Sequence, residues 1–194
     1  RSNNSKEVND QISIEEPLEI ILKYKDKENW IENTISITMR TPGDDEDLVT
    51  GFLFNERVIE KISHIENIEA SGEPTGQYKL QNKVIITINN SENIDIDKIK
   101  RNFLTNSSCG VCGKTSLESL EIIKKDKILK SIPKIHHEII TRSPEILRHN
   151  QSEFSRTGGI HASGLFKANG EIIAVKEDVG RHNALDKLIG FVLK

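Results

Sequence analysis

The only two cysteines of this 194-residue chain, Cys109 and Cys112, lie together in one Cys-x-x-Cys motif. Residues 105–108 before them are turn formers, and leucines at helical spacing follow Lys114. The pattern predicts that both thiols lie at or just before a helix N-terminus. Unpaired backbone N–H groups and the nearby Lys114 cation favour the thiolate there. A thiolate is the form that transfers sulfur, exchanges disulfides or binds a metal.

The spacing alone leaves several kinds of site open. A structural disulfide is disfavoured, because it would close a very short loop in a chain long enough to bury a core. A structural zinc site normally has four protein ligands, and no second Cys-x-x-Cys motif exists. His136, His137 or His161 would have to complete it through the fold. Redox chemistry and sulfur transfer need only the two thiols.

The composition places limits on the environment and on partners. The net charge is −3, and no apolar run approaches the roughly 18 residues of a membrane helix. Residues 1–16 form a polar lead-in without the apolar stretch of a signal peptide. Two free thiols suit a reducing compartment, and a weakly acidic chain gains little from nucleic acid. These features predict a cytoplasmic protein that binds neither membrane nor nucleic acid.

Residues 17–104 are expected to form a β-rich part with one conspicuous helix. Residues 17–24 and 30–39 predict a hairpin, with Ile35, Ile37 and Met39 on one face. A helical period follows the break at residues 41–45, behind an acidic first turn. Residues 83–89 predict another strand and residues 95–103 a short helix. Residues 105–194 form the second part, which contains the cysteine motif.

Two further regions of the second part carry groups that suit a ligand site. Residues 157–166 combine a glycine pair, His161 and small side chains, which let a backbone approach a bulky group. Asn169-Gly170 then predicts a tight turn of a hairpin, which leads to the strand-to-helix connection at residues 176–187. Arg181 at such a helix start suits a phosphate. The simpler alternative is a cap by Asp178, with Arg181 and Lys187 solvated. An apolar stripe of Leu185, Leu188 and Ile189 is expected to follow.

Four ordered blocks give the chain a resemblance to a known family. They are Arg-Thr-Pro-Gly-Asp-Asp-Glu-Asp-Leu-Val-Thr-Gly-Phe-Leu at 40–53, Cys-Gly-Val-Cys-Gly at 109–113, Thr-Gly-Gly-Ile-His-Ala at 157–162 and Glu-Asp-Val-Gly-Arg-His-Asn-Ala-Leu-Asp-Lys at 177–187. In this order and at these separations they resemble the formate dehydrogenase accessory sulfurtransferases, the FdhD/NarQ family.

The resemblance implies a sulfurtransferase that acts as a sulfur carrier in molybdenum or tungsten enzyme maturation. Cys109 would take a persulfide from a cysteine desulfurase, and Cys112 would assist its transfer. The acceptor would be bis(molybdopterin guanine dinucleotide), destined for formate dehydrogenase. The resemblance also suggests a homodimer and no permanent metal. Arg181 would face phosphate, and Asp178 would accept from a guanine edge. The residues expected in the cofactor pocket are Gly158, Gly159, His161, Asp178, Arg181, His182 and Asn183.

The same resemblance implies an α/β fold, a cytidine deaminase-like mixed-sheet sandwich preceded by the smaller β-rich part. Family members continue past the last block, so the C-terminal portion of that sandwich is expected to be absent from this chain. Deaminase chemistry is not expected, because Ser163 stands where the signature needs a glutamate two residues after the histidine. Two alternatives to the sulfur carrier are a thiol-disulfide oxidoreductase and a zinc-stabilised binding module.

Overall fold

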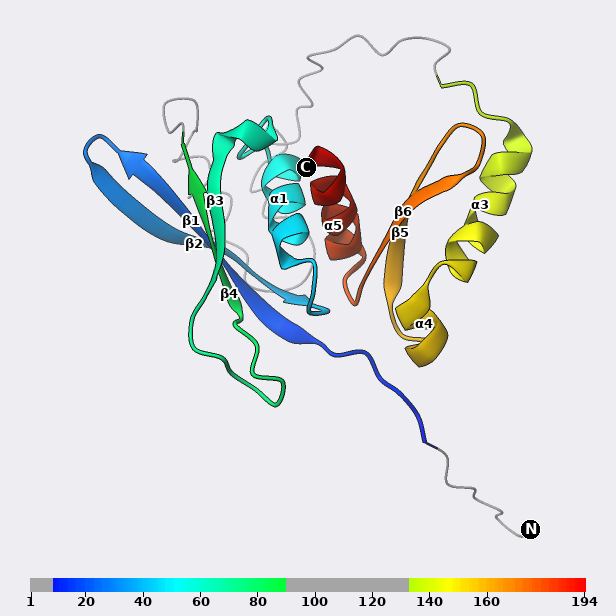
Figure 1. The fold of residues 1–194 in the computed structure, drawn as a ribbon, viewed down its shortest axis with the longest axis horizontal. Coiled ribbons are helices and arrows are strands. Elements are labelled where there is room, and N and C mark those ends of the chain that lie inside the picture. Colours follow the sequence, from blue (N-terminus) through cyan, green and yellow to red (C-terminus); the bar gives the residue numbers. More distant parts are fainter. Residues whose placement is uncertain (1–8, 90–132) are drawn as a thin grey trace, which may run out of the picture.

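A computed structural model describes residues 9–89 and 133–194 (Figure 1). Within them the chain forms a mixed four-stranded sheet, a separate two-stranded sheet and four α-helices, so the predicted α/β class is confirmed. The two cysteines and the helix predicted at residues 95–103 lie outside the described residues. The cytidine deaminase-like arrangement stays a prediction.

The four-stranded sheet contains the predicted hairpin. Strands β1 (Glu16–Asp26) and β2 (Asn29–Arg40) pair antiparallel across a turn in which Lys27 has a φ of 55°. The predicted strand β4 (Lys83–Ile88) lies parallel to β1 on its other side. A 3₁₀ turn, η1 (Ile62–His64), leads into β3 (Ile65–Ser71), which pairs antiparallel with β4. The resulting strand order is β2-β1-β4-β3.

A bulge in β2 overturns the prediction that Ile35, Ile37 and Met39 share a face. Ser36 is opposite Ile20 and Thr34 is opposite Ile21, so Ile35 is an extra residue with no partner of its own. One extra residue reverses the alternation of side chains beyond it. Ile35 therefore faces the core at 4% exposure, whereas Ile37 and Met39 lie on the outer face at 68% and 47%.

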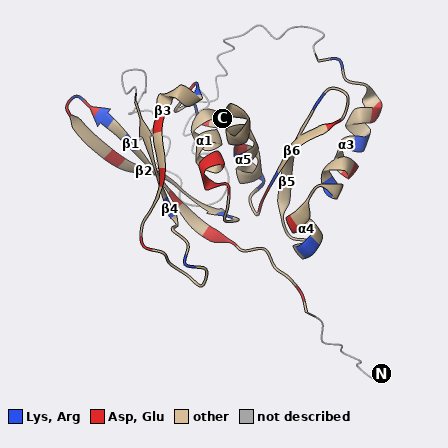
Figure 2. Ribbon diagram, viewed as in Figure 1, with Lys and Arg blue, Asp and Glu red and all other residues tan. Residues whose placement is uncertain are grey.

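One helix packs on the inner face of this sheet, and a second helix lies beside the first. The predicted helix α1 (Asp45–Asn55) begins with three acidic residues, visible in Figure 2, and buries Leu48, Val49 and Leu53. Its neighbour is α5 (Arg181–Leu193), the last helix of the chain. The core residues from the strands and α1 are Leu18, Ile20, Leu22, Tyr24, Ile35, Leu48, Val49, Leu53, Val58, Ile59, Val84, Ile86 and Ile88.

Glycines allow α1 and α5 to approach at backbone distance. A Cβ on Gly51 would lie 1.9 Å from the carbonyl oxygen of Asp186, and a Cβ on Gly190 would lie 1.9 Å from that of Asp47. These two contacts set the helices antiparallel. They also correct the predicted stripe on α5, because Leu185 points outward at 45% exposure while Leu188 is buried.

The second sheet is the predicted hairpin of β5 (His161–Phe166) and β6 (Ile172–Asp178). It follows two helices that the sequence reasoning did not identify, α3 (His137–His149) and α4 (Ser152–Thr157). In Figure 1 the layers run from the four-stranded sheet through α1 and α5 to the hairpin and then to α3. None of the helices in the described part of the chain is long and apolar enough to span a membrane.

Asp186, beside the α1–α5 contact, predicts a pH dependence of stability. Burial raises the pKa of its carboxyl to about 7, the charges of Glu56 and Asp178 act in the same direction, and a hydrogen bond from Asn55 opposes them. Because the folded pKa lies above the unfolded one, ionisation disfavours the fold. The stability that Asp186 contributes is complete below pH 3.8, falls up to about pH 7, and is constant above that.

We expect Asp186→Asn to remove this fall, because the amide oxygen still accepts from Asn55 Nδ2, now 2.5 Å away. Urea unfolding at a series of pH values between 3.8 and about 7 measures this fall in the free energy of unfolding. The variant's free energy of unfolding should exceed that of the wild type increasingly with pH, by on the order of a few kcal/mol at neutral pH. Asp26→Asn, at the exposed end of β1, is the control. Parallel curves for wild type and Asp186→Asn would contradict the prediction.

Candidate functional site

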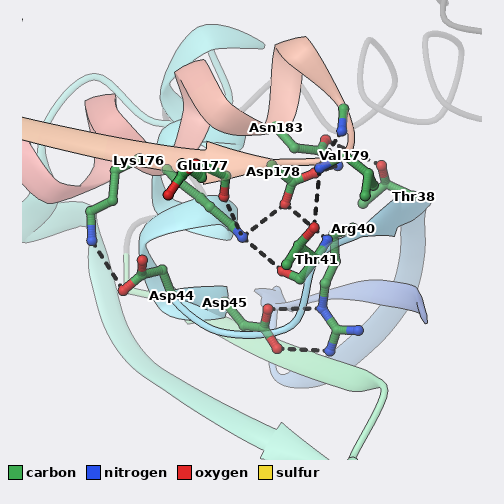
Figure 3. A network of polar contacts seen from close by, with 12 residues as sticks. Thr38, Arg40, Thr41, Asp44, Asp45, Lys176, Glu177, Asp178, Val179 and Asn183 are labelled. Carbon is green, nitrogen blue, oxygen red and sulfur yellow. Dashed lines mark hydrogen bonds and ion pairs between the residues drawn. The ribbon is translucent and has the colours of Figure 1, made fainter. Parts of the chain in front are cut away.

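The carboxylate of Asp178, the last residue of β6, lies at the centre of a buried polar network (Figure 3). Its side chain is 0% exposed. Oδ1 accepts hydrogen bonds from Gly180 N at 2.8 Å and from Asn183 Nδ2 at 3.1 Å. Oδ2 accepts from Thr41 N at 3.1 Å and pairs with Lys187 Nζ at 2.8 Å. All four acceptor positions of the carboxylate are therefore used within the protein.

Lys187 is the cation of this network and is only 2% exposed. Besides Asp178, its ammonium donates to the carbonyl oxygens of Thr41 at 2.7 Å and Glu177 at 3.4 Å. Sequence reasoning treated Lys187 as solvated in the capping alternative. The available signal was its spacing of four residues from Asn183, which puts both side chains on one face of α5.

Asn183 and Thr41 connect the network to β2. Asn183, 8% exposed, donates from Nδ2 to the carbonyl oxygen of Met39 at 2.7 Å and accepts from the Thr38 hydroxyl at 3.2 Å. The Thr41 hydroxyl accepts from the backbone N–H of Val179 at 3.1 Å. The turn from β6 to α5 is therefore bonded directly to the end of β2.

The loop from β2 to α1 is fixed by its own ion pairs. Arg40 is 1% exposed and donates from Nε and Nη2 to the two carboxylate oxygens of Asp45, both at 2.9 Å. Lys176 pairs with Asp44 at 3.0 Å and Asp47 at 2.8 Å. Both Arg40 and Asp45 belong to the first of the four sequence blocks.

Glu177 faces the opposite way from Asp178, because successive side chains of a strand alternate. Its Oε2 accepts from Glu153 N and its Oε1 from Phe154 N, both at 2.9 Å, and the Ser152 hydroxyl lies 3.3 Å away. Glu177 thus caps the N-terminus of α4, for which Gln151, the residue at the cap position, supplies no side-chain bond. At its other end α4 stops at Gly158, whose φ of 69° suits glycine.

The predicted pocket residues fall into two groups. Asp178 and Asn183 are buried, and a direct contact of Asp178 with a ligand would require one of its four partners to leave. The other five are exposed and lie on the loop after α4, at the start of β5 and on the first turn of α5: Gly158, Gly159, His161, Arg181 and His182.

The topology brings the exposed groups to one end of the β5–β6 hairpin. His161 is the residue opposite Asp178 in the strand pair, and α5 begins with Arg181 three residues after Asp178. Within the described ranges no side chain forms a hydrogen bond or ion pair with the Arg181 guanidinium. Arg181 therefore stands available for an anion at a helix N-terminus.

A cleft of about 440 Å³ lies beside this end of the hairpin. It is bounded by residues of the N-terminal lead-in, by Thr41 and Pro42, and by Glu153, Arg156 and Thr157 of α4. The hydroxyls of Ser13 and Thr157 are 2.8 Å apart and join the lead-in to α4. Sequence reasoning left the lead-in out of the site, because its polar residues carry no recognisable motif. The lead-in residues lining the cleft are Gln11, Ile12 and Ile14.

Of the histidines considered for zinc, His136 and His137 lie at the start of α3 and do not line this cleft. His136, His137 and Glu138 are exposed, and their possible ligand atoms lie within 4.8 Å of one another. Side chains of three consecutive residues lie this close together even where no metal is bound, so the cluster alone does not indicate a metal site. The cysteines that a zinc site would also need lie outside the described residues.

Comparison with known proteins decides the family. The sequence model of the FdhD/NarQ family matches residues 13–194. The chain therefore belongs to the FdhD/NarQ family. A curated member from Picrophilus torridus, "Sulfur carrier protein FdhD", is 45% identical over 184 residues, which are 94% of this chain and 64% of that protein. The protein of the same name from Sulfolobus acidocaldarius is 38% identical, over 95% of this chain and 62% of its own length.

A solved structure also resembles the chain. It is a crystal structure from Desulfotalea psychrophila described as that of a formate dehydrogenase accessory protein, with a TM-score of 0.62 and 25% identity. The match covers 97% of this chain and 62% of that one. The chain thus spans a little under two thirds of the length of these relatives.

The cap on α4 generates a stability prediction. Glu177→Gln leaves one acceptor oxygen for the two N–H groups of Glu153 and Phe154, so we expect a loss of about 1 kcal/mol in the free energy of unfolding. Urea unfolding measures the loss. Glu171→Gln, at an exposed ion pair with Lys167, is the control and should change stability by less than about 0.5 kcal/mol. Equal stability of the two variants would show that the cap contributes nothing.

Proposed function

We propose that this protein is a sulfur carrier, a sulfurtransferase that moves persulfide sulfur from a cysteine desulfurase to bis(molybdopterin guanine dinucleotide) for formate dehydrogenase. Membership of the FdhD/NarQ family carries this proposal. The names of the curated relatives support sulfur carriage, and the description of the structural neighbour supports formate dehydrogenase as the recipient. The Cys-x-x-Cys motif supplies the thiols that such a carrier needs.

The loading step conserves atoms and electrons. The thiolate of Cys109 attacks the outer sulfur of the donor persulfide, a new S–S bond forms on Cys109, and the donor S–S bond breaks. The proton of the donor persulfide stays with the transferred sulfur, and the donor cysteine leaves as a thiolate. In this proposal Cys112 assists the later release of that sulfur. The bound sulfur is a soft ligand suited to a molybdenum or tungsten centre.

The exposed end of the β5–β6 hairpin is our proposed contact for the guanine dinucleotide part of the substrate. Arg181 offers a guanidinium for phosphate at the start of α5. His161 and His182 add polar rings, and the backbone at Gly158 and Gly159 leaves open space, since no atom other than a neighbouring backbone oxygen lies within 4 Å of a Cβ placed there. Asp178 and Asn183 are buried beneath this surface and hold the turn before α5 through their hydrogen bonds.

Four wider features belong to the same proposal. The working protein is a cytoplasmic homodimer, and it carries no permanent metal. The complete family fold is a cytidine deaminase-like sandwich to which the described α/β layers contribute. Stoichiometric zinc in protein purified without added metal would instead favour the zinc-stabilised module. Disulfide-reductase activity that is lost in Cys112→Ser would favour the oxidoreductase.

Sulfur loading is the first test of the carrier role. Incubation with a cysteine desulfurase and cysteine should add one sulfur atom to the wild type, detectable by intact-protein and peptide mass spectrometry and removed by reductant. Cys109→Ala should lose the addition, and Cys112→Ala should retain it. No addition to either cysteine, with the thiols shown to be free, would reject the proposed carrier chemistry.

Guanine nucleotide binding tests the proposed acceptor surface. We expect Arg181→Ala to raise the Kd for GDP about tenfold by calorimetry, because a charge-assisted contact with phosphate is lost, while Tm stays nearly unchanged. Arg142→Ala, an exposed arginine on α3, is the matched control and should bind as the wild type does. Equal affinity in the wild type and Arg181→Ala would remove Arg181 from the surface.

A further inference from the structure

We infer that Lys187 is a positioning residue that acts through Asp178 to hold the proposed nucleotide surface in shape. The inference rests on the proposed function, because it assigns Lys187 a role at that surface. Lys187 itself is 2% exposed, so it contacts no ligand. Its effect has to pass through the groups that it bonds.

The ammonium group joins three segments, of which the β2–α1 loop is distant in sequence from the other two. It bonds the end of β6 through the carboxylate of Asp178 and the carbonyl of Glu177, and the β2–α1 loop through the carbonyl of Thr41. Lys187 itself belongs to α5, the helix that begins with Arg181. The Asp178 carboxylate bonds the same three segments from its place in β6, through Thr41 N and through Asn183 and Lys187 of α5.

The position of this bond explains what it fixes. The two residues between Asp178 and α5 are held by hydrogen bonds from their backbone N–H groups. Gly180 N donates to the Asp178 carboxylate, and Val179 N donates to the Thr41 hydroxyl. Arg181 follows at once. If Asp178 or Thr41 shifts, the first turn of α5 shifts with it, and the guanidinium moves relative to His161 on the paired strand.

Charge makes the arrangement depend on Lys187. A buried carboxylate without its cation is strongly unfavourable, so removing Lys187 alone leaves Asp178 uncompensated. In the double variant Asp178→Asn/Lys187→Met neither member of this pair is charged. The one side-chain oxygen left at position 178 can still accept from Gly180 N and Asn183 Nδ2, while the hydrogen bond that Thr41 N donates to the carboxylate is lost. The double variant therefore separates positioning from charge compensation.

The test compares GDP affinity, Tm and amide exchange in three proteins: Lys187→Met, Asp178→Asn/Lys187→Met and the control pair Glu171→Gln/Lys167→Met. The control removes an exposed ion pair of the same two charges, at 2.7 Å. We expect Tm to fall most in Lys187→Met and to recover in the double variant. GDP affinity of the folded double variant should stay at least about tenfold below the wild type, with faster amide exchange across residues 178–183. The control should match the wild type in all three measurements.

Each remaining outcome decides the question. Wild-type GDP affinity and wild-type exchange in a folded double variant would overturn the positioning role. Failure of both Lys187 variants to fold would assign Lys187 to stability alone and would overturn it too. If the wild type binds no GDP, the proposed acceptor surface fails first. Exchange at residues 178–183 needs no ligand, so it still shows whether Lys187 holds the turn.

Discussion

The ion pair between Asp178 and Lys187 is the interaction on which the rest of the described structure depends. Both groups are withdrawn from water, so each is tolerable only because the other is present and because every remaining hydrogen-bonding position is filled. That requirement forces Thr41, the β6–α5 turn and α5 to meet at one point. The four-stranded sheet and the small hairpin are thereby joined through polar bonds as well as through the α1–α5 contact.

The carboxylates of two adjacent residues, Glu177 and Asp178, position different parts of the proposed site. Glu177 and Asp178 point to opposite sides of β6, one fixing the start of α4 and the other fixing the start of α5. The positions of α4, which leads into the glycine loop, and of Arg181 on α5 therefore both depend on bonds to the same strand, β6. A surface assembled from separate loops gains its geometry from these two residues, which do not themselves lie open to a ligand.

The sequence predicted the elements with clear periodicity and missed those whose signal is broken. The β1–β2 hairpin, α1, β4, the β5–β6 hairpin and α5 follow from alternation, helical spacing and turn residues. Helix α3 was missed because Pro144 lies inside it. The Ser143 hydroxyl donates to the Ile140 carbonyl, to which a proline cannot donate, and no propensity rule anticipates that bond. The burial of Lys187 was harder to predict, because its spacing from Asn183 does not reveal that the fold brings it into contact with Asp178, nine residues earlier.

The extra residue at Ile35 determines which side chains of the strand end face the helices. Thr38 and Arg40 turn inward only because the alternation is reversed at that position. Thr38 then bonds Asn183 of α5, and Arg40 bonds Asp45 at the start of α1. The number of residues from Ile35 to Thr41 is therefore set by the buried bonds that Thr38, Arg40 and Thr41 form. Among homologous sequences, length changes in this hairpin should be confined to its exposed tip, where a shift in phase alters no buried bond.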